Sequence, residues 1–404
     1  MPRDDATKPI DQSITQRQRG TRRLRDILSL EDLEAAARRR LPNLIFQYYK
    51  GGTERDMAVT GMRRAFDAWY LKPRVLTPAA ATRSPATTLF GRPYAAPFGI
   101  CPMGGAGFAW HRADSAMAMA AAKADIPFIL SGAAMEPLER IREVGPTAWF
   151  QAYFPGDRAI IGPLVDRVEY AGYDVLVLTV DVAVPGNREN NVRHGYSTPL
   201  RPTVKLGWDG VTHPDWLLNT AWRTLQRDGV PHLENAAATR GVPMFSSRAV
   251  RGSRGAGLTW DEVRWVREIW PRKLVLKGVL AAEDVKLARE IGFDGVIVSS
   301  HGGRQLDYAV PPLRMLPEAL AEAGGMAVML DGGIRRATDA IKALALGAHF
   351  VFLGRPFMYA VAIAGEEGVS HAIRIMLQEL NTDMALLGAE TIAQLNPALL
   401  VPAG

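Results

Sequence analysis

Two side chains suited to acid–base chemistry and to anion binding follow the apolar run at residues 295–298. These are His301 and Arg304, with Gly302 and Gly303 between them. A histidine can accept a proton near neutral pH, and a guanidinium binds a carboxylate through two hydrogen bonds. Adjacent glycines let the backbone turn tightly and come close to a ligand. The stretch therefore predicts a site for a small anionic substrate that must lose a proton; the alternative is a helix-capping loop with surface side chains.

Residues elsewhere in the chain supply partners for such a site. Asp181 follows another apolar run and could orient the imidazole of His301 and stabilise its protonated form. Arg188 could bind a substrate carboxylate together with Arg304, because the planar guanidinium of arginine matches a carboxylate better than the ammonium group of lysine does. Two tyrosines could donate further hydrogen bonds to the substrate or could simply be packing residues: Tyr48 and Tyr153.

These residues need a scaffold that brings them together, and the chain from about residue 97 onward predicts one. Short apolar runs alternate with amphipathic or Ala-rich helical patterns, and the runs begin near residues 97, 127, 147, 174, 273, 295, 327 and 350. Eight such units indicate a parallel (β/α)8 TIM barrel, whose strands are covered on both faces and lack polar alternation. The carboxyl ends of these strands meet at one face, so residues that follow the runs should converge.

Glycine-rich turns after the last two runs are typical of a phosphate site. Residues 331–335 and 354–355 offer backbone N–H groups, and an arginine in either stretch offers a counter-charge. Lys277 ends the fifth run and would be costly to bury without an anionic partner. A cofactor that becomes anionic, as a reduced flavin does, would supply one. Hydrogen-bonding side chains that suit a polar heterocycle end four other runs: Ser131, Gln151, Thr179 and Ser299.

Composition excludes several classes of protein. The 404 residues include one cysteine, Cys101, which excludes an intrachain disulfide, is typical of a reducing compartment and is predicted to be a buried thiol. No apolar run reaches the roughly 18 residues of a membrane-spanning helix, and no secretion signal is expected. The seven histidines are scattered, so no metal site is predicted. No G-x-G-x-x-G follows the first run, which disfavours a Rossmann dehydrogenase.

The net charge of +6 is distributed unevenly along the chain. Residues 1–40 hold ten Lys and Arg against seven Asp and Glu, and residues 198–254 hold eight against four. A nucleic-acid interface would require basic residues clustered on a folded surface with stacking aromatics. The N-terminal charges lie on a polar segment instead, so nucleic acid is not an expected partner.

The chain is predicted to be one domain with two departures from a simple barrel. Residues 1–28 are polar and without apolar periodicity, which predicts disorder, and residues 29–400 form the barrel domain. Helices are expected to begin near Ser29 and within residues 41–52. A long insertion, residues 183–258, follows the fourth strand where a short loop would suffice.

The insertion is open to two interpretations. Trp208, Trp216 and Trp222 lie among the basic residues of 198–254. Basic charge with interleaved Trp and Leu can lie on a membrane surface, which predicts a peripheral membrane contact. The alternative is a mobile flap over the site.

Four motifs in the second half of the chain resemble those of a known family, the FMN-dependent 2-hydroxy acid oxidases and dehydrogenases. They occur in order as Ser299-x-His301-Gly-Gly-Arg304-Gln-Leu-Asp307, Leu330-Asp-Gly-Gly-Ile-Arg335, Lys342-Ala-Leu-Ala-Leu-Gly347 and Gly354-Arg-Pro356. The resemblance covers about residues 29–400 and implies a (β/α)8 barrel that holds FMN.

The resemblance also implies roles for individual residues. It implies FMN contacts at Pro102, Met103, Gly104, Ser131, Gln151, Thr179, Lys277, Ser299, Asp331, Gly332, Gly333, Ile334, Arg335, Gly354 and Arg355. It implies substrate contacts at Tyr48, Tyr153, Arg188, His301 and Arg304. The catalytic residues it implies are His301 as the base, Asp181 as its partner, and Tyr153.

Within the family the sequence most resembles the mandelate dehydrogenase branch and its membrane-associated relatives. Residues 178–184 and the His213-Pro-Asp-Trp216 stretch look like that branch. Gly104 stands where many oxidases carry Ala, and Ala133 stands where glycolate oxidase carries an aromatic residue. Smaller residues leave room for a larger substrate side chain, which favours a mandelate-like substrate over glycolate. L-lactate or another aliphatic 2-hydroxy acid is the alternative, and an FMN barrel isomerase is a more distant one.

The expected reaction is oxidation of an (S)-2-hydroxy acid to the 2-oxo acid, with hydride and carbanion routes both open. Electrons would then pass to quinone if the insertion binds a membrane, or to O2 if it is a lid. The sequence departs from the family pattern at two positions that the resemblance places beside the flavin. Ser300 stands for the usual Asn and Met103 for the usual Thr, so the family pattern does not fix the preferred electron acceptor. The family implies a homotetramer, and the composition implies a cytoplasmic protein, with peripheral attachment at the inner face of the membrane if the insertion binds lipid.

Overall fold

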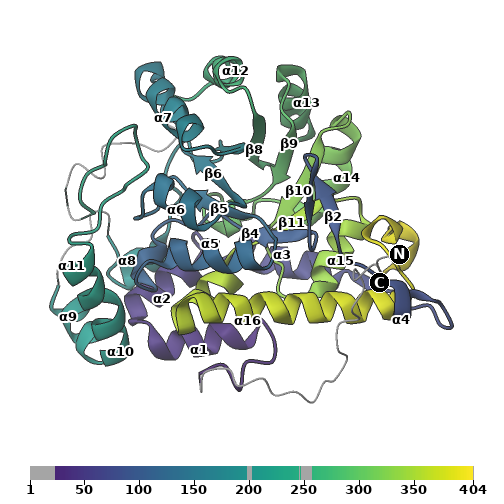
Figure 1. Ribbon diagram of the computed structural model, residues 1–404, viewed down its shortest axis with the longest axis horizontal. Helices are drawn as coiled ribbons and strands as arrows, with labels where there is room; N and C mark the ends of the chain where they lie inside the picture. The colour runs from purple at the N-terminus through teal and green to yellow at the C-terminus, as the bar shows by residue number, and fades with distance from the viewer. Residues whose placement is uncertain (1–22, 198–202, 245, 247–256, 404) are drawn as a thin grey trace, which may run out of the picture.

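Eight parallel strands form the centre of the molecule and close into a barrel in the order β10-β11-β4-β5-β6-β7-β8-β9 (Figure 1). The structure is a computed structural model that describes residues 23–197, 203–244, 246 and 257–403. The strands are β4 (Phe98–Ile100), β5 (Phe128–Ser131), β6 (Ala148–Ala152), β7 (Val175–Thr179), β8 (Lys273–Val279), β9 (Gly295–Val298), β10 (Ala327–Asp331) and β11 (Phe350–Leu353). Each coincides with a predicted apolar run, so the TIM barrel is confirmed.

Alternate strand residues fill the inside of the barrel, as the two-residue period of a strand requires. Val175 and Val177 of β7 belong to the inner cluster, whereas Leu176 and Leu178 pack in the larger cluster that includes the helices. A hairpin, β2 (Thr87–Leu89) with β3 (Arg92–Tyr94), adds residues to the inner cluster. Because the interior is packed with side chains, ligands can be held only at the ends of the strands.

Eight helices alternate with the strands and cover the barrel from outside (Figure 1). They are α5 (Ala113–Lys123), α6 (Leu138–Val144), α7 (Arg158–Tyr170), α12 (Trp260–Ile269), α13 (Ala282–Ile291), α14 (Pro312–Glu322), α15 (Ala337–Ala345) and α16 (Arg355–Leu387). Shorter elements are α4 (Ala79–Thr82), the pair β1 (Trp69–Leu71) with β12 (Leu400–Pro402), and the 3-10 turns η1 (Ala106–Phe108), η4 (His301–Gly303), η5 (Ile392–Gln394) and η6 (Pro397–Leu399).

Three helices precede the barrel: α1 (Asp32–Arg40), α2 (Asn43–Lys50) and α3 (Met57–Asp67). The first begins three residues after the predicted Ser29, because the Asp32 carboxylate accepts the backbone N–H of Ser29 at 2.8 Å and holds that residue outside the helix. The predicted disorder of 1–28 is wrong for its last part, since Leu24 and Ile27 are buried in the core. Two apolar side chains suffice to dock this short segment; residues 1–22 lie outside the described residues.

The insertion forms a separate group of helices beside α1 and α2 (Figure 1). Its elements are α8 (Glu189–Arg193), α9 (Val204–Val211), α10 (Pro214–Trp216), the π-helical turn η2 (Leu217–Trp222) and α11 (Arg223–Arg227). Asp215 joins the group to the barrel domain, because its carboxylate lies 2.6 Å from Nε of Arg40. The indole of Trp216 donates to the carbonyl of Phe108 at 2.7 Å. No helix among the described residues is both long enough and apolar enough to cross a membrane.

Candidate active site

A cavity of about 960 Å³ opens at the carboxyl ends of the strands. Most residues predicted for the site line it, although they come from segments far apart in the sequence. They are Tyr48, Pro102, Met103, Gly104, Tyr153, Thr179, Arg188, Lys277, His301, Arg304, Asp331, Gly332, Gly333, Ile334, Arg335, Gly354 and Arg355. The structure thus brings together His301, the arginines and the glycine-rich turns, as predicted from the strand ends.

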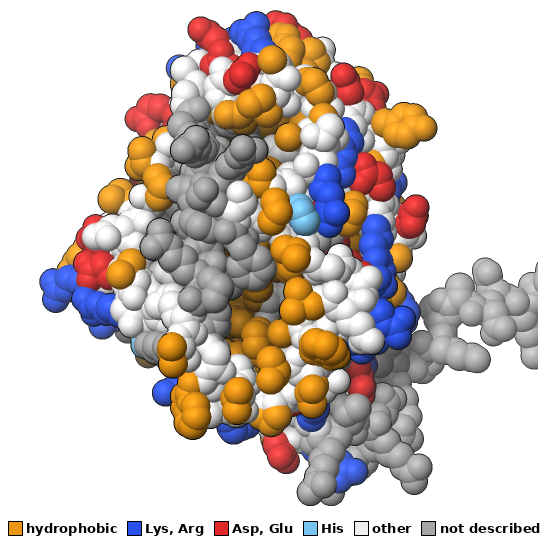
Figure 2. Space-filling model, turned by 90° about the vertical axis from the view of Figure 1, so that its left-hand side faces the viewer, with side chains coloured by type: hydrophobic (Ala, Val, Ile, Leu, Met, Phe, Trp, Pro, Cys, Tyr) orange, Lys and Arg blue, Asp and Glu red, His pale blue; other side chains and the backbone are white. Residues whose placement is uncertain are grey.

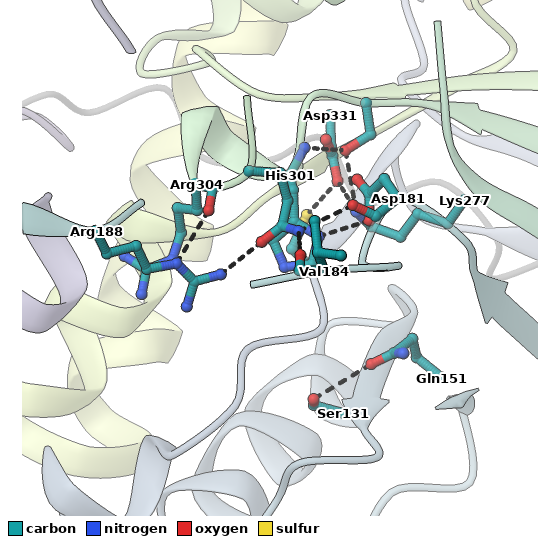
Figure 3. Close-up of polar contacts among 12 residues, drawn as sticks. Ser131, Gln151, Asp181, Val184, Arg188, Lys277, His301, Arg304 and Asp331 are labelled. Carbon is teal, nitrogen blue, oxygen red and sulfur yellow. Dashed lines mark hydrogen bonds and ion pairs between the residues drawn. The ribbon is translucent and has the colours of Figure 1, made fainter. Parts of the chain in front are cut away.

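Four predicted residues do not line the cavity but lie directly behind its wall. Asp181 bonds to His301, and Ser299 bonds to Lys277 and to the backbone N–H of His301. Ser131 donates to the side-chain oxygen of Gln151 at 3.2 Å. In Figure 3 Asp181 belongs to the network around His301 and Lys277, whereas Ser131 and Gln151 lie apart from it.

His301 is held in a fixed orientation by its neighbours. Its Nδ1 lies 2.9 Å from Oδ1 of Asp181, a carboxylate that is largely buried. Burial alone would raise the pKa of Asp181, but the adjacent His301 and Lys277 lower it below its usual value. The carboxylate therefore remains ionised and fixes the imidazole through Nδ1. His301 has a φ of 55°, a left-handed backbone conformation that is uncommon for a residue with a side chain and is often found at functional sites.

Close packing of Asp181 depends on the absence of a side chain at Gly278. That residue has a φ of 99°, and a Cβ placed on it would lie 2.5 Å from Cγ of Asp181. The bulge in β8 after Lys277 allows this conformation. Lys277 and Gly278 therefore both contribute to the site, the lysine through its side chain and the glycine through the space that it leaves for Asp181.

Lys277 is buried and has an anionic partner, but this partner is a carboxylate of the chain, whereas the sequence predicted an anionic cofactor in this role. Its Nζ lies 2.9 Å from Oδ2 of Asp331 and 3.0 Å from Oγ of Ser299. Burial would lower the pKa of Lys277, but Asp331 and Asp181 raise it above its usual value. The ammonium is therefore charged at the cavity wall. Cys101 is a buried thiol as predicted, and it donates to the same Oδ2 at 3.3 Å.

Arg304 and Arg188 lie at the outer part of the cavity with different partners. Nη1 of Arg304 donates to the carbonyls of Tyr48 and Gly51, both at 2.7 Å. Arg188 donates from Nε to the carbonyl of Arg304 at 3.0 Å and from Nη2 to Gln305 at 2.8 Å. Arg188 therefore also orients the loop that carries Arg304, a role that its sequence context did not indicate.

The turns after β10 and β11 offer a site for a phosphate. Arg335 and Arg355 line this part of the cavity, and neither forms an ion pair with a carboxylate in the described part of the chain. Burial lowers the pKa of Arg335 and lowers that of Arg355 to about 10. Gly332 and Gly333 both have positive φ, which turns the chain so that backbone N–H groups are available to an anion. Two partly buried cations that have no carboxylate partner among the described residues fit a phosphate group.

At the wall of the cavity and directly behind it lie buried polar atoms that lack a partner within the described residues. These are Nε2 of Gln151, Oγ1 of Thr179 and Oδ1 of Asp331. Buried polar groups are nearly always hydrogen-bonded, so unpaired atoms at a cavity wall indicate a polar ligand. Unpaired donors and acceptors together with the two arginines fit FMN, whose ring is polar at its edge and whose phosphate is anionic.

Comparison with known proteins places the chain in a family. A family model described as FMN-dependent dehydrogenase matches residues 37–402. The chain belongs to the FMN-dependent dehydrogenase family. FMN is therefore its cofactor, and the predicted family resemblance is confirmed.

Individual relatives are similar over nearly the whole chain. The (S)-mandelate dehydrogenase of Pseudomonas putida is 36% identical over 374 residues, which cover 92% of this chain and 93% of that protein. An L-lactate dehydrogenase of Ectopseudomonas mendocina (strain ymp) is 37% identical, with 92% and 97% covered. A crystal structure of the monotopic membrane protein (S)-mandelate dehydrogenase matches with a TM-score of 0.87 and 36% identity, and covers 93% of this chain and 100% of that one.

Several residues that line the cavity were not predicted from the sequence. The first part of the insertion contributes Asn187, Asn191 and Tyr196. Their side-chain types give no distinctive signal, because asparagine and tyrosine are common in surface loops. Cys101 also lines the cavity, and for this residue a signal existed, since it follows β4 at its carboxyl end. Ala133, which was predicted from sequence to lie beside the substrate, lines the cavity as well.

Proposed function

We propose that this enzyme oxidises an (S)-2-hydroxy acid with a bulky, mandelate-like side chain to the corresponding 2-oxo acid. The observation that carries the proposal is the pair of His301 and Asp181 at 2.9 Å, at the wall of a cavity that also holds Arg304. A base and a guanidinium at one cavity suit a substrate that carries both a carboxylate and an acidic proton.

The roles of the residues follow from their positions. Nη1 of Arg304 donates hydrogen bonds to two backbone carbonyls, and the other N–H groups of the guanidinium can bind the substrate carboxylate. Tyr48 and Tyr153 line the same cavity and can donate hydrogen bonds to the substrate. His301 takes a proton from the substrate on Nε2, because Nδ1 already faces Asp181. The Asp181 carboxylate then stabilises the imidazolium. Bound FMN supplies the acceptor for the two electrons.

The space beside the substrate supports a large side chain. Gly104 and Ala133 face one another at the cavity wall, and a Cβ on Gly104 would lie 2.9 Å from the Cβ of Ala133. Neither position extends a side chain beyond Cβ into the cavity, and this supports a substrate with a bulky group. The relatives named L-lactate dehydrogenase support a second candidate substrate, an aliphatic 2-hydroxy acid.

Anaerobic mixing of the FMN-loaded enzyme with (S)-mandelate and with (S)-lactate tests both parts of the proposal. Loss of flavin absorbance that is much faster with mandelate is the expected result. Faster loss of flavin absorbance with lactate would support the proposed reaction, but it would contradict the inference of a bulky substrate from Gly104 and Ala133. No loss with either acid, in enzyme that contains FMN, would overturn the proposed reaction.

We further propose that the insertion attaches the enzyme to the inner face of the membrane and that quinone is the electron acceptor. Helices α9 to α11 expose six apolar side chains: Val204, Trp208, Val211, Leu218, Trp222 and Leu225. Figure 2 looks at this side of the molecule and shows hydrophobic side chains gathered beside a hollow. Exposed Trp and Leu near basic residues suit a lipid–water interface. A structural relative titled a monotopic membrane protein also supports the proposal.

Cosedimentation with lipid vesicles tests the attachment. Wild-type protein should sediment with vesicles that contain anionic lipid, and replacement of both Trp208 and Trp222 by Ser should abolish this without changing flavin reduction by substrate. Equal sedimentation of the double variant would contradict a membrane contact through these helices. Reoxidation by O2 as fast as by a quinone analogue would contradict the proposed acceptor. The homotetramer stays a prediction, which light scattering after gel filtration can check.

A further inference from the structure

The first part of the insertion, residues 187–197, is fixed to helix α2 and does not stand away from the barrel. The side-chain amide of Asn190 donates to the carbonyl of Gln47 at 3.1 Å. Asn43 and Nδ1 of His194 lie 3.1 Å apart. These contacts join the insertion to the helix that carries Tyr48, so the two segments form one wall of the cavity.

Within this wall, the rings of Tyr196 and Tyr48 are stacked. Their centroids lie 4.2 Å apart and their planes differ by 17°. The guanidinium carbon of Arg304 lies 5.0 Å from the centroid of the Tyr48 ring. All three residues line the cavity. The ring of Tyr48 also meets that of Tyr49 edge-on, at a centroid distance of 5.2 Å. The orientation of Tyr48 is therefore supported by its neighbour in α2, by the arginine that is placed to bind the substrate, and by one residue of the insertion.

Stacked aromatic pairs and cation–π contacts each stabilise one ring orientation beyond what burial alone provides. A tyrosine hydroxyl moves by several ångströms when its ring tilts, since it lies at the far end of the ring. The Tyr48 hydroxyl can reach a substrate reliably only if its ring is held, and the stacked ring of Tyr196 covers one face of it.

We infer that Tyr196 is a positioning residue for substrate binding, acting through Tyr48. This inference rests on the proposed oxidation of a 2-hydroxy acid and adds to it that the insertion forms part of the substrate pocket. Tyr196 acts on the binding of the acid, and proton removal by His301 proceeds through its own contact with Asp181. Loss of the Tyr196 ring therefore weakens binding more than it slows the chemical step.

Three variants test the inference: Tyr196→Leu removes the ring, Tyr196→Phe retains it, and Tyr170→Leu makes the same exchange at an exposed position on α7. Steady-state kinetics with (S)-mandelate give KM and kcat, and titration with the 2-oxo product, followed by the flavin spectrum, gives a binding constant without turnover. Tyr196→Leu should raise KM and the product dissociation constant about threefold to tenfold, with kcat within about twofold. Tyr196→Phe and Tyr170→Leu should stay within about twofold of wild type in all three constants.

Several results would overturn the inference. One is a KM of Tyr196→Leu that stays within about twofold of wild type. Another is a loss in Tyr196→Phe as large as in Tyr196→Leu, since the hydroxyl and not the ring would then matter. If Tyr196→Leu lost bound FMN, or if its kcat fell by as large a factor as its KM rose, Tyr196 would have a structural role only. Absence of flavin reduction by any 2-hydroxy acid in the wild type would overturn the proposed function itself, and this inference with it.

Discussion

Asp181 and His301 are 120 residues apart in the sequence, yet Oδ1 of Asp181 lies 2.9 Å from Nδ1 of His301. The contact joins the segment after β7 to the turn after β9, two strands that both pair with β8. It determines which nitrogen of the imidazole faces the cavity. Three predictions concern this pair and the network around it, and a fourth concerns the size of the substrate pocket.

Replacement of His301 by Gln should reduce flavin reduction by substrate about 10²- to 10⁴-fold, because a positioned general base contributes a factor of this size. FMN content should stay unchanged, since the exchange leaves in place the backbone carbonyl of Gly302, which accepts from Nη2 of Arg355 at 2.8 Å. Rapid-mixing absorbance measurements check the rate. A variant that reduces its flavin at the wild-type rate would exclude His301 as the base.

Replacement of Asp181 by Asn should change the pH dependence of stability. The pKa of Asp181 is lowered in the folded protein relative to its usual value of 3.8. A group with a lowered pKa stabilises the fold above its unfolded pKa, and this contribution is lost as pH falls through the folded pKa. The difference in Tm between wild type and Asp181→Asn should therefore be constant near neutral pH and shrink below about pH 4. A difference independent of pH down to pH 2 would contradict the lowered pKa.

Replacement of Lys277 by Met should destabilise the protein by about 3–5 kcal/mol, because it leaves the buried carboxylate of Asp331 without its cation. Denaturant unfolding measures the change. The double variant Lys277→Met with Asp331→Asn should recover part of this loss, since no uncompensated charge then remains.

An exposed ion pair provides the control for this measurement. Lys123→Met removes the partner of Glu366, a pair in which the lysine side chain is 71% exposed, and should cost no more than about 1 kcal/mol. If the free energy of unfolding fell equally in Lys277→Met and in Lys123→Met, the buried ion pair would contribute no more to stability than the exposed one.

Replacement of Gly104 by Ala should narrow the substrate pocket, because the added Cβ would lie 2.9 Å from the Cβ of Ala133. The ratio of kcat/KM for mandelate to that for lactate should fall about tenfold, within the range for one methylene in a tight pocket. Gly207→Ala is the control, since a Cβ at that position has no neighbour within 4 Å. An unchanged ratio would show that Gly104 does not limit the size of the substrate.

Much of the barrel and of its inner site could be predicted from sequence because the signals are local. A continuous apolar run predicts a buried parallel strand wherever it occurs, and the residue after it must lie at the carboxyl end. This reasoning placed His301, Lys277 and the glycines at 332 and 333 at the cavity. It also held for Asp181, which lies behind the cavity wall and bonds to His301.

The outer part of the site was decided only by tertiary structure. The stacking of Tyr196 on Tyr48 depends on how the insertion docks against α2, and hydrogen bonds such as that from Asn190 to Gln47 join segments 143 residues apart. The same holds for Arg188, whose bonds to the loop of Arg304 span more than a hundred residues. Periodicity and turn chemistry describe a segment and its immediate neighbours. Which loop packs against which helix depends on the shapes of surfaces that exist only after the barrel has closed.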